Sequence, residues 1–381
     1  MEAVVRTGAT FFGYESLNRV SFLRNDVEFV RKSLQHKSTV FVPFVQGEAL
    51  VRGQEEPELC LLTLQDGWFP MARVVDKLLP VLNSQAARVV ESGANLTFLG
   101  LKSSDGDDVF QYRSSYSGVP YYAVDFRTSG GTLIQAAELE PLLQCARVDR
   151  KLIFEMSNET ASLYSHAKMY LDWLAKYHFC PGCGSVMFPV DAGTKMQCGN
   201  ADRSVACNVR DAAVNNVCFP RTDPVVIVAI ATKDFSRICL AHSKRWVHDT
   251  LYSTVAGFME PAETVEQACS REIWEETGIR CRDITLVSTQ PWPYPANLMI
   301  GCVGLVEPNG VDEKINLSHD NELMDAQWFD VEEVIEAMDR YDGSGVVKFK
   351  KSDITFPGST AIAFHLIKFV CDRYKRSLGS L

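Results

Sequence analysis

The stretch from Gly257 to Ile279 constrains the fold and the chemistry of this chain more than any other. It carries three glutamates, Glu272, Glu275 and Glu276, at positions i, i+3 and i+4, which a helix places side by side on one face. Like charges at these spacings repel by roughly 0.2–0.5 kcal/mol per pair, so we expect a cation among them. Mg²⁺ prefers a few carboxylates together with substrate phosphates. The stretch therefore predicts metal-assisted hydrolysis of a phosphate compound.

Composition limits the classes of protein that remain. The chain has 381 residues, 46% hydrophobic and 23% charged, which suggests two or three globular domains. A net charge of −10 argues against non-specific binding to nucleic acid, although a local basic groove stays open. The first residues lack a secretory pattern and no apolar run is long enough to cross a membrane, so we expect a cytoplasmic protein with no membrane contact.

Cysteines indicate a second metal centre. Twelve cysteines are too dilute for a disulfide scaffold, but Cys180 and Cys183 frame a tight Cys-Pro-Gly-Cys turn typical of structural zinc. Cys198 follows after fourteen residues, and Cys207 after eight more, against the roughly two to four that are usual within a pair. We expect these four cysteines to hold one structural Zn²⁺, with Cys218 as the alternative fourth ligand. A redox Cys-x-x-Cys and incidental buried cysteines are the other interpretations.

Periodicity and turn residues predict an α/β chain of three domains: residues 1–170 as a structural or dimerising domain, 176–220 as a zinc ribbon and 221–381 as the catalytic domain. A mixed sheet with helices on both faces is expected in the last of these. Strands are predicted at residues 39–45, 59–64, 96–101, 121–126, 224–231, 239–242, 251–257, 282–289, 297–306 and 323–330. Helices are predicted at residues 27–34, 161–177, 331–340 and 359–375, in addition to the glutamate-bearing helix.

Several motifs in this sequence together resemble those of a known family. Gly257, Glu263, Arg271-Glu272 and Glu275-Glu276-Thr277-Gly278 match the Nudix box at every defined position. The segment Gln290–Pro295 resembles the Gln-Pro-Trp-Pro-Phe-Pro signature of NADH pyrophosphatases, and a zinc ribbon just before Phe219 is similar to the same subfamily. Residues 16–45 are similar to its additional N-terminal domain. The resemblance implies a Nudix α/β/α sandwich preceded by the ribbon and that domain.

The resemblance also implies roles for the acidic residues. Glu272, Glu275, Glu276 and Glu322 would hold two or three Mg²⁺ or Mn²⁺ ions, and Glu276, or else Glu322, would orient or deprotonate the attacking water. For Glu322 an ordinary surface acid is the alternative. Glu263 and Arg271 are expected to pair and to lock the loop to the helix.

For the substrate, the resemblance implies that Phe258 stacks on a base and that Trp292 reaches a substrate in the partner subunit of a homodimer, with ordinary packing as the alternative for both. Further pocket residues are placed by matching positions only. These are Ala256, Gly257, Gln290, Asn297, Ile227, Phe219 and Ala363. Ala262 stands where the family usually has glycine, which predicts a strained backbone at that residue.

The resemblance implies hydrolysis of the pyrophosphate of NADH or NAD⁺ to a nicotinamide mononucleotide and AMP. Alternatives are removal of an NAD cap from RNA 5′ ends, a broader dinucleotide pyrophosphatase acting on ADP-ribose or diadenosine polyphosphates, and a zinc-ribbon binding protein with an inactive Nudix domain. The final residues, Gly379-Ser380-Leu381, keep the small residue and terminal leucine of a peroxisomal address but lack its basic middle residue, so a peroxisome-like compartment is a second expectation.

Overall fold

The structure is a computed structural model that describes residues 10–53, 58–80, 82, 92–106, 108–213, 215–246 and 250–378. The contacts divide the described residues into two compact units, one within Tyr14–Arg221 and the other within Thr222–Leu378, and the second unit includes residues 10–13. The predicted C-terminal address at residues 379–381 lies outside the described residues. Among the described residues, no helix is both long and apolar enough to cross a membrane.

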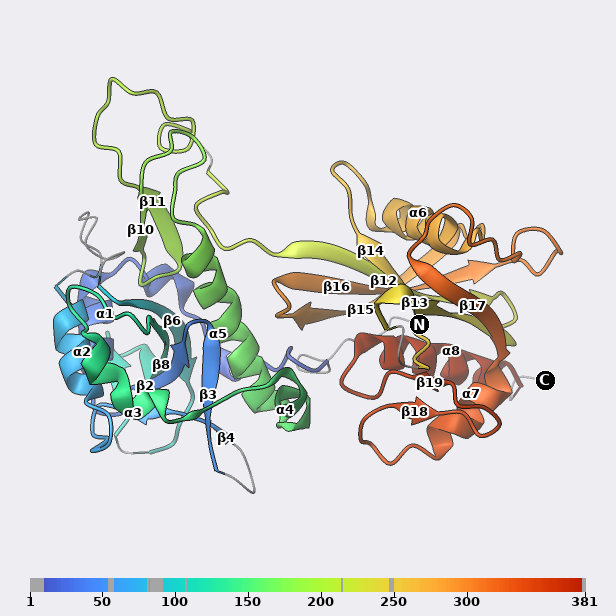
Figure 1. Ribbon diagram of the computed structural model, residues 1–381, viewed down its shortest axis with the longest axis horizontal. Helices are drawn as coiled ribbons and strands as arrows, with labels where there is room; N and C mark the ends of the chain where they lie inside the picture. Colours follow the sequence, from blue (N-terminus) through green and yellow to red (C-terminus); the bar gives the residue numbers. More distant parts are fainter. Residues whose placement is uncertain are drawn as a thin grey trace. The chain divides into compact units, whose positions relative to one another are not determined.

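The first unit is a mixed sheet flanked by helices and followed by a two-stranded hairpin (Figure 1). Its elements are β1 (Leu17–Asn18), η1 (Ser21–Leu23), α1 (Val27–Leu34), β2 (Val40–Val45), β3 (Glu48–Arg52), β4 (Glu58–Leu59), β5 (Leu62–Thr63), α2 (Met71–Leu78), β6 (Ala94–Lys102), β7 (Phe110–Tyr112), β8 (Tyr116–Phe126), η3 (Ala136–Leu139), α3 (Glu140–Leu143), β9 (Ala146–Arg147), α4 (Arg150–Glu155), α5 (Asn158–Lys176), β10 (Met187–Val190) and β11 (Lys195–Cys198). The order along the sheet is β1-β6-β8-β2-β3-β4, with β2 and β8 parallel.

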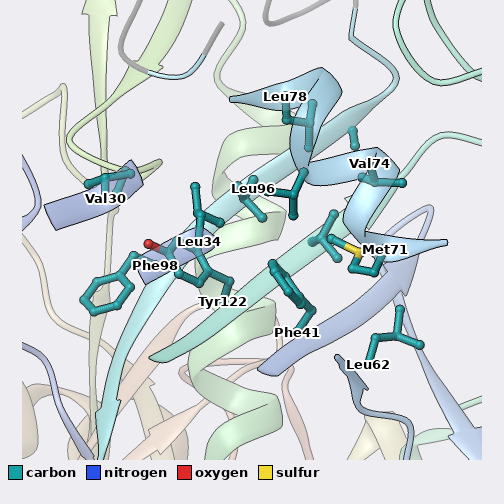
Figure 2. Close-up of a cluster of buried hydrophobic side chains, with 14 of the residues drawn as sticks. Val30, Leu34, Phe41, Leu62, Met71, Val74, Leu78, Leu96, Phe98 and Tyr122 are labelled. Carbon is teal, nitrogen blue, oxygen red and sulfur yellow. The ribbon is translucent and has the colours of Figure 1, made fainter. Parts of the chain in front are cut away.

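The core of this unit lies between the sheet and helices α1 and α2. Helix α1 begins after Asp26, whose carboxylate accepts the amide hydrogens of Glu28 and Phe29, and it buries Phe29, Val30 and Leu34. Figure 2 shows these helices and strands β2, β5, β6 and β8 contributing side chains to one cluster. The predicted strand over residues 59–64 is wrong, because Cys60 and Leu61 interrupt it and leave the two short strands β4 and β5.

The second unit is a six-stranded mixed sheet between helices. Its elements are β12 (Asp223–Thr232), β13 (Arg237–Ser243), η4 (Lys244–Trp246), β14 (Val255–Phe258), α6 (Val265–Thr277), β15 (Asp283–Trp292), β16 (Asn297–Val306), β17 (Leu323–Asp330), α7 (Val331–Asp339), β18 (Val347–Lys348), β19 (Thr355–Phe356) and α8 (Ile362–Leu378). Strands run in the order β15-β16-β12-β13-β17, and β14 pairs with the first half of β12. Only β12 and β16 are parallel among the strands described for this sheet.

Strand β12 shows why this sheet is covered on both faces. Val226, Val228 and Ile230 pack in the cluster under α6, whereas Ile227 and Ala229 alternate with them and pack against α7 and α8. Figure 1 shows α6 on one side of the sheet, with α8 and α7 on the other. The predicted α/β class, with a mixed sheet between helices, is confirmed.

Residues 10–13 pack on the second unit. Thr10 donates its hydroxyl to the Thr289 carbonyl at 3.0 Å, and the Phe11 carbonyl accepts from Gln290 Nε2 at 2.9 Å. The Phe12 ring meets the edge of Trp292, with ring centroids 5.7 Å apart. The start of the chain therefore helps to hold the end of β15.

Candidate functional site

Helix α6 has strong local signals at both ends. Thr264 and Gln267 form a capping box in which each side chain accepts the other residue's backbone amide hydrogen. Gly278 ends the helix in the left-handed region with φ of 73°. These caps fix the helical register that places Glu272 and Glu276 one turn apart on the sheet side.

The glutamates of α6 are unequally exposed. Glu272 and Glu276 are buried, Glu275 is half-buried, and Glu322, which lies just before β17, is exposed. Burial, and then repulsion from Glu272, Glu322 and Asp320, raises the pKa of Glu276 to about 8. Burial also raises the pKa of Glu272. Buried like charges with oxygen donors are what a hard divalent cation would stabilise, so these residues fit the predicted Mg²⁺ or Mn²⁺.

Arg271 is the positioning residue of this cluster, and all five of its hydrogen-bond donors are used. Its Nε and Nη2 bind the two carboxylate oxygens of Glu263 at 2.6 and 2.9 Å, which is the predicted pair. Its Nη1 reaches Glu272 at 2.7 Å and Glu275 at 3.0 Å, and Nη2 also donates to the Phe258 carbonyl at 2.9 Å. The hydrogen bonds from Arg271 lower the pKa of Glu263 to about 2. Loop, strand and helix are thus joined at one guanidinium.

Gly257 brings the backbone of β14 against the acidic cluster. A Cβ at this position would lie 2.0 Å from the Glu272 carboxyl carbon, which no side chain could tolerate without moving that carboxylate. The requirement for glycine here is therefore close approach rather than an unusual φ angle.

Sequence reasoning missed two neighbours of the cluster. Arg245 Nη2 lies 3.2 Å from Glu322 Oε2, and Asp320 adds negative charge near Glu276. Asp320 could have been found from its place two residues before Glu322. No sequence signal marks Arg245, because strand pairing across 77 residues brings it there.

Most of the predicted pocket residues share the other face of the sheet. Gly257 faces Glu272, so its neighbours Ala256 and Phe258 point to the α8 side. The strand register puts the remaining members on that face. Ile227 is the cross-strand partner of Ala256, and Asn297 is the cross-strand partner of both Asp223 and Trp292. Ile227 also shares a buried cluster with Ala363.

Two of these residues, Phe258 and Asn297, each present a group that is available to a ligand. Phe258 is 58% exposed, so its ring is available for stacking. Asn297 Oδ1 is buried and accepts no hydrogen bond from any described residue. Because buried acceptors are normally paired, this oxygen is available to a hydrogen-bond donor of a ligand. Trp292, in contrast, packs against Phe12 and Tyr294 of its own unit.

Gln290, expected in the substrate pocket, lies inside the second unit. It is fully buried, Nε2 donates to the carbonyls of Phe11 and Thr360 at 2.9 Å each, and Oε1 accepts the Ile362 amide hydrogen at 2.8 Å. Its side-chain amide thus joins Phe11 to the start of α8.

Gln290→Leu is expected to lower the free energy of unfolding by about 3 kcal/mol, because three backbone groups, two of them buried, lose their partner. Chemical denaturation of the full chain measures it, with Gln111→Leu at an exposed position of β7 as control. Equal loss in both variants would contradict the positioning role.

Phe219 belongs to the unit Tyr14–Arg221. Its ring is 47% exposed and Lys195 Nζ lies 5.3 Å from the ring centroid. The structure therefore gives Phe219 a cation–π contact within the first unit.

The expected strain at Ala262 is present, with φ of 70°. Left-handed backbone costs a residue with a Cβ about 1–2 kcal/mol. Ala262→Gly is therefore expected to raise the free energy of unfolding by about 1 kcal/mol, measured by chemical denaturation. Ala256→Gly, in extended backbone of β14, is the control and should lower it. A destabilised Ala262→Gly protein would show that the loop conformation is not strained.

The second centre gathers four sulfurs from the hairpin β10–β11 and its flanking loops. The Sγ atoms of Cys180, Cys183, Cys198 and Cys207 all lie within 4.8 Å of one another. The Sγ–Sγ distance is 3.6 Å between Cys180 and Cys207, 3.5 Å between Cys183 and Cys198, and 4.0 Å between Cys198 and Cys207. A zinc tetrahedron with Zn–S of about 2.3 Å has sulfur separations of about 3.8 Å, so the four thiols fit that ion.

Cys218, the alternative ligand, is outside this group. Its sulfur accepts a hydrogen bond from Asn215 Nδ2 at 3.2 Å, and its carbonyl accepts the Met196 amide hydrogen at 2.7 Å.

Arg210 explains how Cys207 reaches the site after an unusually long spacing. Its guanidinium donates to the carbonyls of Asn200, Asp202 and Val205 at 2.8–3.1 Å, so the loop after Cys198 folds around one side chain. Asp211 pairs with Arg210 and also accepts the Cys207 amide hydrogen at 3.2 Å.

Comparison with known proteins matches a family to each of the two regions. The NUDIX domain profile matches residues 221–348, and the NADH pyrophosphatase zinc ribbon domain matches residues 175–205, which implies divalent-metal dependence and a zinc ion. The chain is 54% identical over 376 residues to the NAD-capped RNA hydrolase NPY1 of Saccharomyces cerevisiae, covering 97% of each chain. It is 30% identical over 381 residues to the NAD-capped RNA hydrolase of Schizosaccharomyces pombe, covering 96% of this chain and 94% of the relative. It is 27% identical over 350 residues to the mitochondrial NAD(P)H pyrophosphatase NUDT13 of Mus musculus, covering 89% and 94%.

Proposed function

Because this chain belongs to the zinc-ribbon-containing NADH pyrophosphatase subfamily of Nudix hydrolases, we propose that it cleaves the pyrophosphate of NADH or NAD⁺ to a nicotinamide mononucleotide and AMP. The observation that carries the proposal is the arrangement around β14. Acidic residues lie on its α6 side, and Phe258 with the open Asn297 oxygen lies on its α8 side.

Strand β14 pairs with β12 alone among the described strands, so its other edge is available for a ligand to cross. A dinucleotide lying over this edge would stack one ring on Phe258 and place its pyrophosphate beside Glu272 and Glu276. Small residues suit such a crossing, and the strand has Ala256 and Gly257 there. The architecture thus matches a substrate with an aromatic ring at one end and a charged bridge in its middle.

The proposed reaction gives a role to each of the acidic residues and to Arg271 and Gly257. Glu272, Glu275, Glu276 and Glu322 would hold two or three Mg²⁺ or Mn²⁺ ions, which when bound neutralise phosphate charge and lower the pKa of a bound water. Glu276 would accept the proton of the attacking water, with Glu322 as the second candidate. Arg271 keeps Glu272 and Glu275 in place, and Gly257 lets the phosphates approach the backbone.

The test is product analysis with purified protein. NADH, NAD⁺, ADP-ribose and a diadenosine polyphosphate are compared by kcat/KM in Mg²⁺ and in Mn²⁺, with AMP as the common product. The proposal requires a higher kcat/KM for NADH or NAD⁺ than for the other two. Preference for ADP-ribose would reassign the protein to a broader pyrophosphatase, and no metal-dependent turnover would indicate a binding protein.

A second candidate function is removal of the NAD cap from RNA. The observation that favours it is similarity along almost the whole chain to two relatives that carry that name. Release of nicotinamide mononucleotide from NAD-capped RNA, measured in competition with NADH, separates the two functions. A kcat/KM for capped RNA well above that for NADH would make the RNA the preferred substrate.

We also propose a homodimer, supported by the resemblance of Gln290–Pro295 to the subfamily signature. Sedimentation of the full chain measures its mass in solution. A monomer with full activity would exclude a contribution of Trp292 to a partner's site.

A further inference from the structure

The first unit contains a pocket that the proposed hydrolysis does not use. Its volume is about 570 Å³, within the range of roughly 300–1,000 Å³ that is usual for small-molecule sites. Gln46, Asn95, Asp125, Arg127, Lys176 and Phe179 are among the residues that line it. They come from the β2–β3 turn, from β6, from β8 and the residue after it, and from the end of α5 and the residues that follow.

Two polar side chains form its buried wall. Asn95 on β6 and Asp125 on β8 are direct cross-strand partners, so their side chains lie next to each other on one face of the sheet. Asn95 is 8% exposed, yet its amide forms no hydrogen bond to any described residue. A buried amide normally has a partner, so an unpartnered one that lines a pocket points to a ligand.

Asp125 is also incompletely satisfied. It is 6% exposed, and among the described residues its carboxylate accepts one hydrogen bond, from the Gly47 amide at 3.0 Å. Burial raises the pKa of Asp125 to about 6. The other acid of the pocket, Asp172, is neutralised by Lys168, whose Nζ lies 2.8 Å from Oδ2. Asp125 is therefore the acceptor that a ligand's hydroxyl or amino group would meet.

Cations and an aromatic ring complete the pocket. Arg127 and Lys176 both line it, and neither forms an ion pair with another described residue. Phe179 is 66% exposed and presents its ring to the same space. Free guanidinium and ammonium groups suit a phosphate, while an exposed aromatic ring suits a nucleobase.

We propose that this pocket binds a ribonucleoside 5′-phosphate, with Arg127 and Lys176 on the phosphate, Asp125 and Asn95 on the sugar hydroxyls or base edge, and Phe179 stacked on the base. The ligand has two sources with the same chemistry, a free mononucleotide or one nucleotide of an RNA strand. A plain anion site would not need the buried amide and carboxylate, and a purely apolar ligand would leave both without partners.

The test measures binding of AMP to the zinc-loaded full chain by calorimetry, without added Mg²⁺ or Mn²⁺. Asn95→Leu keeps the approximate volume of the side chain and removes its amide, and Arg127→Gln removes the charge. Each is expected to weaken AMP binding by roughly 10-fold or more, as expected when a hydrogen bond to a buried or charged group is lost.

Two matched controls accompany these variants. Thr97→Val removes a buried hydroxyl from the same strand, β6, and Arg31→Gln removes an exposed guanidinium from α1. Both are expected to bind AMP like the wild type. Should Asn95→Leu fail to fold, the half-buried Arg127 position still decides the result.

Further ligands separate the sources. A 5′-phosphorylated single-stranded RNA that displaces AMP, and loses affinity in the same two variants, assigns the pocket to an RNA strand. AMP binding without RNA binding assigns it to a free nucleotide. The proposal is overturned if both variants bind AMP like the wild type, if inorganic phosphate binds as tightly as AMP, or if neither AMP nor RNA binds.

Discussion

Glu276→Gln is expected to lower kcat for release of AMP from NADH by about 10²–10⁴-fold, the usual contribution of a positioned proton acceptor. Glutamine keeps the shape of the side chain but removes the charge that a metal ion and a water proton would need. The position is also one where charge is costly, because burial and three neighbouring carboxylates raise the pKa of Glu276 to about 8. The variant should therefore be at least as stable as the wild type, so lost activity with retained folding identifies a functional group.

Initial rates at saturating NADH and Mg²⁺ or Mn²⁺ give kcat, and chemical denaturation gives stability. Glu266→Gln is the matched control, since Glu266 is an exposed glutamate in the first turn of the same helix. It should keep near wild-type kcat. Wild-type turnover in Glu276→Gln would remove that residue from the mechanism, and a larger loss in Glu322→Gln would move the proton acceptor to Glu322.

Features decided by local sequence were predicted well. Strand β16 and helix α1 have the predicted bounds, Asn297–Val306 and Val27–Leu34, because apolar periodicity and caps act over a few residues. The pair of Glu263 and Arg271 was also predicted, since both belong to one continuous motif.

Features that depend on contacts between distant parts of the chain were not predicted from the sequence. Gln290 was expected in the substrate pocket, but two of its hydrogen-bond partners, Phe11 and Thr360, lie 279 and 70 residues away. Arg245 meets Glu322 only because η4 follows β13, which pairs with β17. Patterns of single residues carry no information about such partners, so these roles required the fold.

The candidate site, with acidic residues on one side of β14 and Phe258 and Asn297 on the other, was predicted only in part. The sequence identified Phe258, Asn297 and the glutamates, but it contained no sign that β14 would separate them. That separation follows from strand alternation once Gly257 is known to face Glu272. The proposed path of the substrate over the edge of β14 therefore rests on the strand register as well as on the matching positions.

Removing one zinc ligand is expected to have the second large effect. Cys207→Ser should reduce zinc from about one ion per chain to a small fraction and unfold the segment around β10 and β11, because structural zinc in small peptides contributes about 10–16 kcal/mol of apparent folding free energy. Arg210 and Asp211 hold the Cys207 loop by hydrogen bonds and one ion pair, and these would not replace the bonds to the ion. Elemental analysis gives the zinc content, and limited proteolysis reports order between residues 180 and 218.

Cys218→Ser is the control, a buried cysteine of the same segment whose sulfur lies outside the cluster. It should keep its zinc and its protection. Zinc loss in Cys218→Ser with full zinc in Cys207→Ser would exchange the two assignments, and the long loop around Arg210 would then need another explanation.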